Sequence, residues 1–376
     1  FVYTSLAIDS NDLPHISYYD PLNDTLRYSN FDGTSWSDSV LTSGGDNGKY
    51  NSIGIDSNDY PRISFYNDSS DDLELASWDG TAWSMEIVDS TGNVGTYSSI
   101  AIDSTDRTRI AYCTPSGNDL RYASHDGSSW DIEDVDTDRY CSYAAMSLGP
   151  NDSPRISYYD SYSDDAVLAY SNSVGQNEWT LVAVMEDGDS GGYMSMDTDS
   201  DGTAFMTYKD GTNIDLIHSE VYTATVWATE AVASTGDLSS SYPGSWAGHI
   251  GGEFHSVYVN ATSGMMEHLI GFDRTEKKVQ VASGTHGTYA SMATDSRGNR
   301  HVAYLNSSAG SLDYAKFSHS GVSVERIDIG SVGHHPSIAI DSNDRPHISY
   351  VQYSSHLLKY AHYDGTGWEI STIDDL

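Results

Sequence analysis

An aromatic residue returns every 46 to 50 residues along this chain, and rings at such regular positions could bind a ligand together. Tyrosine rings stack on the apolar faces of sugars or on aromatic groups, and their hydroxyls hydrogen-bond polar edges. The alternative is that the rings only pack against one another and plug a channel. At one of the eight positions the chain has Pro243, with Tyr242 beside it. The other seven are Tyr3, Tyr50, Tyr97, Tyr143, Tyr193, Tyr289 and His335.

Histidines gather at the last two of these positions. His334 and His335 are adjacent, and His286 lies three residues before Tyr289. Imidazoles near neutral pH serve as bases or metal ligands, although exposed loop histidines need no such role. A base beside a tyrosine resembles, in general terms, the propeller-type polysaccharide lyases, in which the base removes a proton next to a uronate carboxylate. Such an enzyme also needs a positive group to neutralise that carboxylate, for which Arg139 or a bound cation is a candidate.

The segment 197–202, Asp-Thr-Asp-Ser-Asp-Gly, is similar to the start of a calcium-binding loop. Asp197, Asp199 and Asp201 would supply oxygen ligands at alternate positions. The acidic ligand expected at the end of such a loop is missing, and the segment also aligns with an ordinary turn of the repeat. A structural Ca²⁺ ion is therefore one hypothesis, and turn formation is the other.

Polar residues recur eleven positions after the residue that marks each repeat, which is Asp9 in the first repeat and Asp341 in the last. Asp20, Asp160 and Asp210 stand there, and we expect them to hydrogen-bond a ligand on the tyrosine-bearing face, unless they only form turns. Four asparagines at or near this position begin Asn-x-Ser/Thr sequons, and glycans there would crowd the same face. They are Asn23, Asn67, Asn260 and Asn306.

These residues belong to a repeat that is clearest at 337–350, Ser-Ile-Ala-Ile-Asp-Ser-Asn-Asp-Arg-Pro-His-Ile-Ser-Tyr. A period of 40 to 50 residues with several short strands is typical of a β-propeller. In the first copy, strands are expected over 5–9, 15–20, 26–31 and 37–42. The sequence thus predicts an all-β, eight-bladed β-propeller of four-stranded antiparallel blades, forming a single domain over 1–376. The reference positions are Asp9, Asp56, Asp103, Gly149, Asp199, His249, Asp295 and Asp341.

Each blade is complete from contiguous sequence, so closure is expected to depend on side-chain packing between the first and last blades. The turn between the third and fourth strands reads Ser-Asn-Phe-Asp-Gly-Thr-Ser-Trp over 29–36, with counterparts ending at Trp83, Trp130 and Trp368. These turns resemble the Asp-box of neuraminidase-type repeats, in which an Asp turn and a packed Trp close the hairpin. The resemblance implies a propeller architecture that sialidases, polysaccharide lyases and lectins share.

Sialidases also need three arginines that grip a carboxylate. The recurring arginines here begin the second strand, at the end away from the expected binding face, so sialidase activity is not expected. They are Arg62, Arg109 and Arg155.

Charge and cysteines narrow the partners. With 55 acidic and 18 basic residues, the formal net charge of −37 disfavours nucleic acid and anionic membranes. No apolar run approaches the roughly 18 residues that span a bilayer, so no membrane insertion is expected. Cys113 and Cys141 are expected on one face of adjacent blades, where a disulfide is geometrically reasonable; two free buried thiols are the alternative. The chain begins at Phe1, and we expect it to be part of a longer, secreted or cell-surface protein.

The leading hypothesis is a recognition module that binds a glycan or a cell-surface protein at the tyrosine-rich face. A polysaccharide lyase that uses His334 or His335 with Tyr289 is the alternative. A third is a structural unit of a surface assembly with no small ligand.

Overall fold

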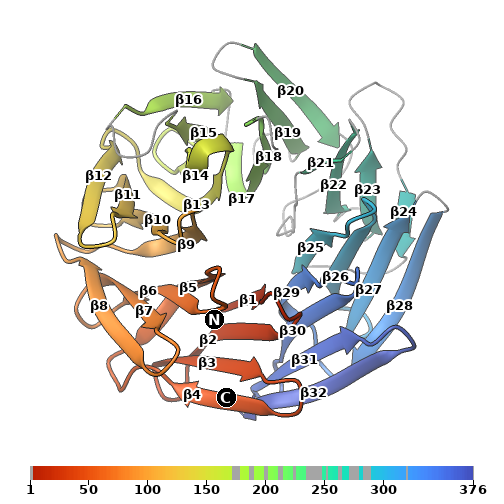
Figure 1. Cartoon of the computed structure of the whole chain (residues 1–376). Coiled ribbons are helices and arrows are strands. Elements are labelled where there is room, and N and C mark those ends of the chain that lie inside the picture. Colours follow the sequence, from red (N-terminus) through yellow and green to blue (C-terminus); the bar gives the residue numbers. More distant parts are fainter. Residues whose placement is uncertain are drawn as a thin grey trace.

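The computed structural model describes residues 3–171, 178–185, 190–198, 202–210, 289–318 and 321–375, together with six strand backbones between 215 and 282. The described strands pair into eight four-stranded antiparallel sheets, which stand around a central opening as in a β-propeller (Figure 1). In these ranges the helical element is the short 3-10 helix η1, Pro150–Asp152. No helix among them is long and apolar enough to cross a membrane.

Each sheet is made of four strands that are consecutive in the sequence. Sheets 1 and 2 contain β1 Thr4–Ile8, β2 Pro14–Asp20, β3 Thr25–Phe31, β4 Trp36–Val40, β5 Asn47–Ile55, β6 Pro61–Asn67, β7 Asp72–Trp78 and β8 Trp83–Asp89. Sheets 3 and 4 contain β9 Thr96–Ile102, β10 Thr108–Thr114, β11 Asp119–His125, β12 Trp130–Asp136, β13 Cys141–Leu148, β14 Pro154–Asp160, β15 Asp165–Tyr170 and β16 Thr180–Met185. Sheets 5 and 6 contain β17 Ser190–Thr198, β18 Ala204–Asp210, β19 Asp215–Tyr222, β20 Val226–Ala233, β21 Gly248–Ile250, β22 Glu253–Asn260, β23 Met265–Ile270 and β24 Val279–Ala282. Sheets 7 and 8 contain β25 Ala290–Thr294, β26 Arg300–Asn306, β27 Ser311–Ser318, β28 Gly321–Ile329, β29 His334–Ile340, β30 Pro346–Gln352, β31 Leu357–Tyr363 and β32 Trp368–Asp375.

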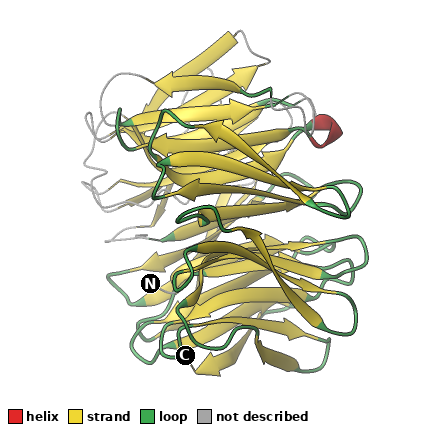
Figure 2. Ribbon diagram, turned by 90° about the vertical axis from the view of Figure 1, so that its left-hand side faces the viewer, coloured by secondary structure: helices red, strands yellow, loops and turns green. Residues whose placement is uncertain are grey.

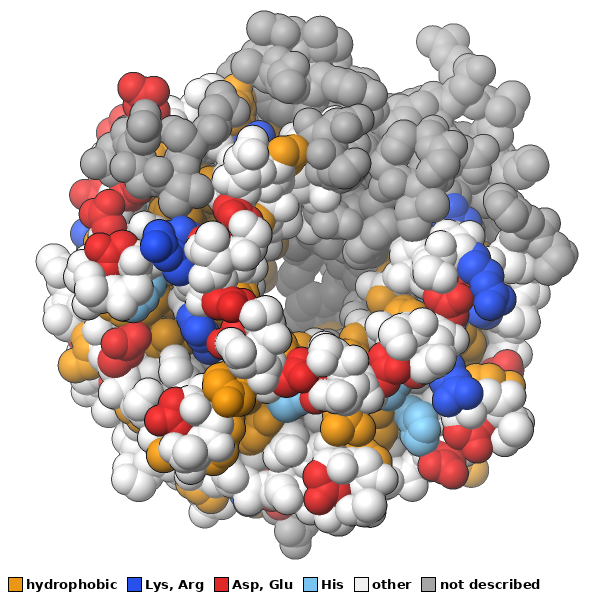
Figure 3. Space-filling view, in the orientation of Figure 1, with side chains coloured by type: hydrophobic (Ala, Val, Ile, Leu, Met, Phe, Trp, Pro, Cys, Tyr) orange, Lys and Arg blue, Asp and Glu red, His pale blue; other side chains and the backbone are white. Residues whose placement is uncertain are grey.

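The antiparallel path gives the ring two distinct faces. In Figure 2 the two termini lie on the left and η1 lies on the right. We call the first the crossing face, because it holds the connections between sheets and the turns between second and third strands. The other, the turn face, holds the turns between first and second strands and between third and fourth strands. Figure 3 looks onto the turn face.

The first and last sheets close the ring through side chains, as expected from the contiguous repeats. Ile16 and Tyr18 of sheet 1 pack with Val351, Leu358 and Tyr360 of sheet 8 in one buried cluster. The Tyr18 hydroxyl donates to Asp374 Oδ2 at 3.0 Å, which adds a polar contact across the same joint. Apolar burial and this hydrogen bond therefore hold the first and last sheets together, where other closed sheets share a strand.

On the turn face, a serine of one sheet clamps an aspartate of the next. At the closing joint, the backbone N–H and the hydroxyl of Ser342 donate to the two carboxylate oxygens of Asp12, both at 2.7 Å. The aspartate has a left-handed backbone, φ 64° at Asp12, which is the region that Asp tolerates best among ordinary residues. The described residues contain the clamps Ser10–Asp59, Ser57–Asp106, Ser104–Asp152, Ser296–Asp344 and Ser342–Asp12.

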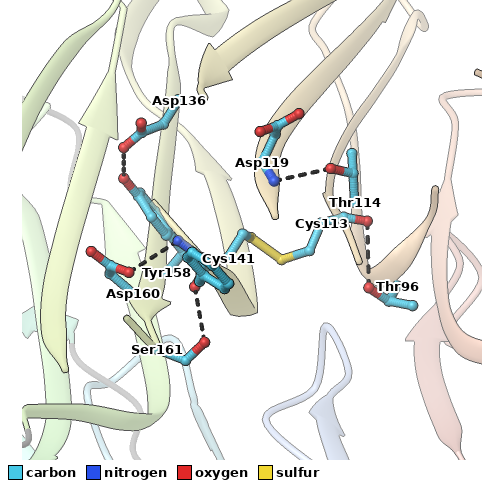
Figure 4. Close-up of a disulfide and its surroundings, with 10 residues drawn as sticks. Thr96, Cys113, Thr114, Asp119, Asp136, Cys141, Tyr158, Asp160 and Ser161 are labelled. Atoms are coloured by element: carbon cyan, nitrogen blue, oxygen red, sulfur yellow. Dashed lines mark hydrogen bonds between the residues drawn. A yellow bond between two sulfur atoms is a disulfide. The ribbon is translucent and has the colours of Figure 1, made fainter. Parts of the chain in front are cut away.

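Cys113 of β10 and Cys141 of β13 form the disulfide that the repeat positions predicted (Figure 4). Their Cα atoms are 5.4 Å apart, within the range that a disulfide requires. The bond joins sheets 3 and 4 on the crossing face, beside the buried hydrogen bond from Tyr158 to Asp136. It therefore links two sheets covalently that otherwise meet through side-chain packing.

Candidate functional site

Four of the predicted tyrosines form a continuous arc on the crossing face. The ring centroids of Tyr3 and Tyr50 are 4.8 Å apart, those of Tyr50 and Tyr97 4.6 Å, and those of Tyr97 and Tyr143 5.0 Å. All four rings are half-buried, so each is held by neighbours and still reaches solvent. The rings contact one another, as the plug hypothesis requires, but their partial exposure leaves surface for a ligand.

The arc continues through the joint between sheets 8 and 1. The ring centroids of Tyr289 and His335 are 4.2 Å apart, and the backbone carbonyl of His335 accepts a hydrogen bond from Thr4 Oγ1 at 3.1 Å. Thr4 follows Tyr3 directly, so this hydrogen bond places the Tyr289–His335 pair next to the arc, and we call the six rings together the collar. The collar is Tyr289, His335, Tyr3, Tyr50, Tyr97 and Tyr143. The side chain of Tyr193, with Tyr242 and Pro243, lies outside the described residues.

The backbone of the collar is unusual. Tyr50, Tyr97, Tyr143 and His335 have φ values of 52°, 53°, 54° and 47°. Each lies where the pairing of the first and second strands shifts register, as at a β-bulge. A left-handed conformation costs a bulky residue about 1–3 kcal/mol, and such strain clusters at ligand clamps and other functional sites. The collar therefore has the backbone signature of a site as well as the residue types.

The collar is uncharged at neutral pH. Burial raises the pKa of Tyr50 to about 12, and burial also raises the pKa of Tyr3. Burial lowers the pKa of His335 to about 4, with a smaller contribution from neighbouring His334. Burial lowers the pKa of His334 as well. At pH 7 the rings are thus neutral phenols and neutral imidazoles, which suit stacking and hydrogen bonding to an uncharged ligand.

The structure brings together only some of the residues that the lyase hypothesis requires. Tyr289 contacts His335, but an imidazole with a pKa of about 4 is a weak base at pH 7. The candidate cation, Arg139, donates to Asp136 at 2.9 Å and lies 3.7 Å from a carboxylate oxygen of Asp160. Its charge is therefore already neutralised by the protein. His286 lies outside the described residues.

The strand-end aspartates Asp20 and Asp160 are buried and hydrogen-bonded within the turns that they begin, which agrees with the turn alternative. Asp20 is 0% exposed and accepts hydrogen bonds from Leu22 N at 2.9 Å and Asn23 Nδ2 at 2.7 Å. Asp160 is 1% exposed and accepts from Tyr140 N and Tyr162 N, both at 3.0 Å. Both carboxylates are used by the turns they begin, because buried acceptors there must be paired.

Two of the sequon asparagines are also committed to their turns. The side-chain amide of Asn67 donates to Glu74 at 2.7 Å, and that of Asn306 donates to Asp313 at 2.8 Å. Both amides are buried, so the folded protein does not offer these nitrogens to a glycosylating enzyme. The side chains of Asn260 and Asp210 lie outside the described residues.

The predicted calcium ligands lie largely outside the described residues. Asp197 lies in β17 with its side chain undescribed, and Asp199 and Asp201 are undescribed altogether. Among the described residues, no group of three or more His, Cys, Asp or Glu side chains is placed to hold a metal ion.

Sheets 1, 7 and 8 share a buried Asp–His–Tyr chain that was not among the predicted site residues. In sheet 7, His301 Nε2 lies 3.1 Å from Asp295 Oδ2, and Nδ1 lies 2.6 Å from the Tyr314 hydroxyl. The signal was present in the repeat, because a histidine six and a tyrosine nineteen positions after the reference aspartate occur together. The counterparts are Asp9–His15–Tyr28 and Asp341–His347–Tyr360.

Comparisons with known proteins show the fold. No protein family and no curated protein sequence matches this chain. The dihydro-heme d1 dehydrogenase NirN is similar in structure, with a TM-score of 0.61 and 12% identity over 95% of this chain and 74% of that one. The polysaccharide lyase Uly1 has a TM-score of 0.51 and 9% identity, over 86% and 90% of the two chains. A fucose-binding lectin of Aleuria aurantia covers 100% of this chain and 96% of its own, with 11% identity and a TM-score of 0.46. The likenesses to NirN and Uly1 concern the fold alone.

Proposed function

We propose that this chain is an eight-bladed β-propeller that recognises a glycan with its collar, as an extracellular or cell-surface module. The observation that carries the proposal is the unbroken arc of half-buried, neutral rings on the crossing face, with centroids 4.6 to 5.0 Å apart from Tyr3 to Tyr143. The polysaccharide lyase Uly1 among the structural neighbours agrees with a carbohydrate role at the level of fold.

The collar would bind an uncharged sugar by stacking. Aromatic faces cover the C–H faces of a pyranose, while the phenol hydroxyls hydrogen-bond its equatorial hydroxyls. The rings contact each other and their backbones are fixed at bulges, so little side-chain freedom is lost on binding. Several rings in a row favour a polymer over a single sugar, because each additional sugar unit finds another ring.

The Cys113–Cys141 disulfide supports the proposed location. Disulfides persist in secreted and cell-surface proteins and are rare in reducing compartments. The glycan-binding hypothesis implies that the partner is a cell-surface protein that carries the glycan. A purely structural unit of a surface layer would need no exposed rings, so it accounts less well for the collar.

A polysaccharide lyase is the second candidate, favoured by the contact between Tyr289 and His335. The low pKa of His335 and the paired Arg139 weigh against it. The two candidates differ in outcome: the lyase shortens the polymer and produces an unsaturated sugar that absorbs ultraviolet light. His335→Ala would abolish that product without abolishing binding.

The test is affinity for a panel of neutral polysaccharides, with the size of the sugar analysed after incubation. We expect Tyr50→Ala and Tyr97→Ala each to weaken binding roughly tenfold, in line with about 1–3 kcal/mol per stacked ring. Tyr60→Ala is the matched control, because Tyr60 is half-buried on the turn face. Unchanged binding by both collar variants would show that the collar is not the site.

A structural calcium ion at Asp197, Asp199 and Asp201 stays a proposal that rests on their alternate spacing. If the ion is bound, a chelator lowers the melting temperature and added Ca²⁺ restores it, because a ligand of the folded state stabilises that state. Asp201→Asn should then remove the response to calcium.

A further inference from the structure

Two related clefts open on the turn face, one between sheets 7 and 8 and one between sheets 8 and 1. Their volumes are about 310 Å³ and about 230 Å³. Each has an aromatic pair from the later sheet on one side: Tyr363 with Trp368 in the first, and Phe31 with Trp36 in the second. The clefts are thus copies of one design, related by the repeat.

The opposite wall of each cleft is the buried Asp–His–Tyr chain. In the larger cleft, the edge of Trp368 meets Tyr314, with ring centroids 4.9 Å apart, and the Tyr314 hydroxyl is hydrogen-bonded to His301. In the smaller cleft, Trp36 meets Tyr360 in the same way at 4.8 Å. Both indoles are half-buried and held by this wall, so each offers a rigid stacking surface.

Arg345 lines both clefts and is exposed. Among the described residues its guanidinium makes no hydrogen bond and no ion pair. It lies over the Asp-Gly turn of sheet 8, where a Cβ on Gly365 would be 3.2 Å from Arg345 Nη2. In a chain with 55 acidic and 18 basic residues, most arginines have a carboxylate available as a partner. An arginine above two aromatic clefts that has no ion pair among the described residues is therefore a candidate ligand-binding residue.

Carboxylates also line both clefts: Asp12, Asp341 and Glu369 line the smaller one, and Glu325 and Asp344 line the larger one. Lys316 and Arg297 line the larger cleft as well, and each has one carboxylate partner: Asp295 at 3.4 Å and Asp344 at 3.3 Å. Figure 3 shows Lys, Arg and His side chains interspersed with Asp and Glu side chains over sheets 7 and 8 on the turn face. In the smaller cleft, the buried His347 Nε2 has no hydrogen-bond partner and is 3.6 Å from Asp341 Oδ2.

From these contacts we propose that the larger cleft is a subsite for a single sugar ring that carries an anionic substituent, a carboxylate or a sulfate. The ring stacks on Trp368, and the anion pairs with the fork of Arg345. The volume of about 310 Å³ matches one ring rather than a chain, since ligand pockets usually start at about 300 Å³. The smaller cleft is not expected to bind the anion, because three carboxylates share it with Arg345.

This inference does not rest on the collar, which lies on the opposite face and is neutral. The two sites predict different ligands on one molecule: neutral polymer at the collar and an anionic ring at the larger cleft. The net charge of −37 does not prevent the second, because charges beyond about 8 Å are largely screened at physiological salt.

The experiment is calorimetric titration of the intact chain with trigalacturonic acid and with its uncharged methyl ester. A sulfated galactan oligosaccharide and its desulfated form distinguish the second source of the anion. We expect binding of at least one charged member and at least tenfold weaker binding of its neutral partner. Arg345→Gln should weaken the charged ligand roughly tenfold or more, as loss of a charge-assisted hydrogen bond implies.

Arg326→Gln is the matched control, because Arg326 is an exposed arginine of sheet 7 outside the clefts. Equal binding of charged and neutral sugars, or full binding by Arg345→Gln, would overturn the proposal. Tyr97→Ala should leave binding of the charged sugar intact while it weakens neutral polymer. The failure of one site is thereby separated from the failure of the other.

Discussion

The left-handed backbone at Tyr97 leads to a prediction that reverses the usual order of two substitutions. Tyr97 has φ 53° and lies in β9, where the pairing with β10 shifts register. Both Tyr97→Ala and Tyr97→Gly remove the ring and its contacts, so their difference reports the backbone alone. A left-handed L-residue costs about 1–2 kcal/mol, and glycine has no such cost.

The expected magnitude follows from two opposing effects. Glycine in a strand interior is less stable than alanine by roughly 0.5–1 kcal/mol, because it loses more freedom on folding. Relief of the left-handed strain exceeds this, so Tyr97→Gly should be more stable than Tyr97→Ala by about 1 kcal/mol. The assay is urea denaturation at 25 °C, with the fluorescence of the packed tryptophans as the signal.

Ala101→Gly is the control in the same strand, since Ala101 has an ordinary φ. It should be destabilised by about 0.5–1 kcal/mol. If Tyr97→Gly is also less stable than Tyr97→Ala, the strand is not strained at Tyr97. The collar would then lose the backbone argument for its function.

The other predictions concern the joints and pH. Replacing Cys113 and Cys141 by serine should lower the free energy of unfolding by about 3 kcal/mol, measured in urea, because the bond closes a loop with a separation of 28 residues. Asp12→Ala should cost about 1–3 kcal/mol, because two exposed hydrogen bonds from Ser342 are lost and alanine is strained at φ 64°; an unchanged midpoint would show that neither the clamp nor this backbone conformation stabilises the ring. The folded pKa of His335 is about 4, below the unfolded value of about 6.5, so the unfolded state binds the proton first. Stability should therefore be lost as pH falls from about 6.5 towards about 4, and His335→Gln should flatten that part of the urea midpoint against pH.

The repeat allowed the local structure to be predicted from the sequence. The strands expected over 15–20 and 26–31 are β2 Pro14–Asp20 and β3 Thr25–Phe31 in the structure. Turn and strand residues alternate at fixed spacing, and each strand pairs with its sequence neighbour, so register follows from short-range order. The disulfide was predictable for the same reason: two repeat positions on one face of adjacent sheets must lie close together.

Asp20 shows what the sequence could not distinguish. A carboxylate at a strand end has the same sequence signature whether it faces a ligand or caps its own turn. Only the folded chain shows that Leu22 and Asn23 donate to it and that it is fully buried. The left-handed collar was equally invisible, because φ at Tyr50 depends on a register shift against the neighbouring strand.

The sequence by itself determined the strands, their order and the recurrence of tyrosine, because these depend on neighbours a few residues apart. The tertiary structure decided which recurring residues became surfaces. Arg345 aligns with Leu13 in the first repeat and Tyr60 in the second. The alignment does not show whether the guanidinium of Arg345 is paired with a carboxylate. That depends on what the adjacent sheet places opposite: Trp36 and Trp368 stand across the clefts that Arg345 lines. Sites between sheets are made by residues from different repeats, and the cleft between sheets 8 and 1 joins the two ends of the chain, so only the closed ring brings these residues together.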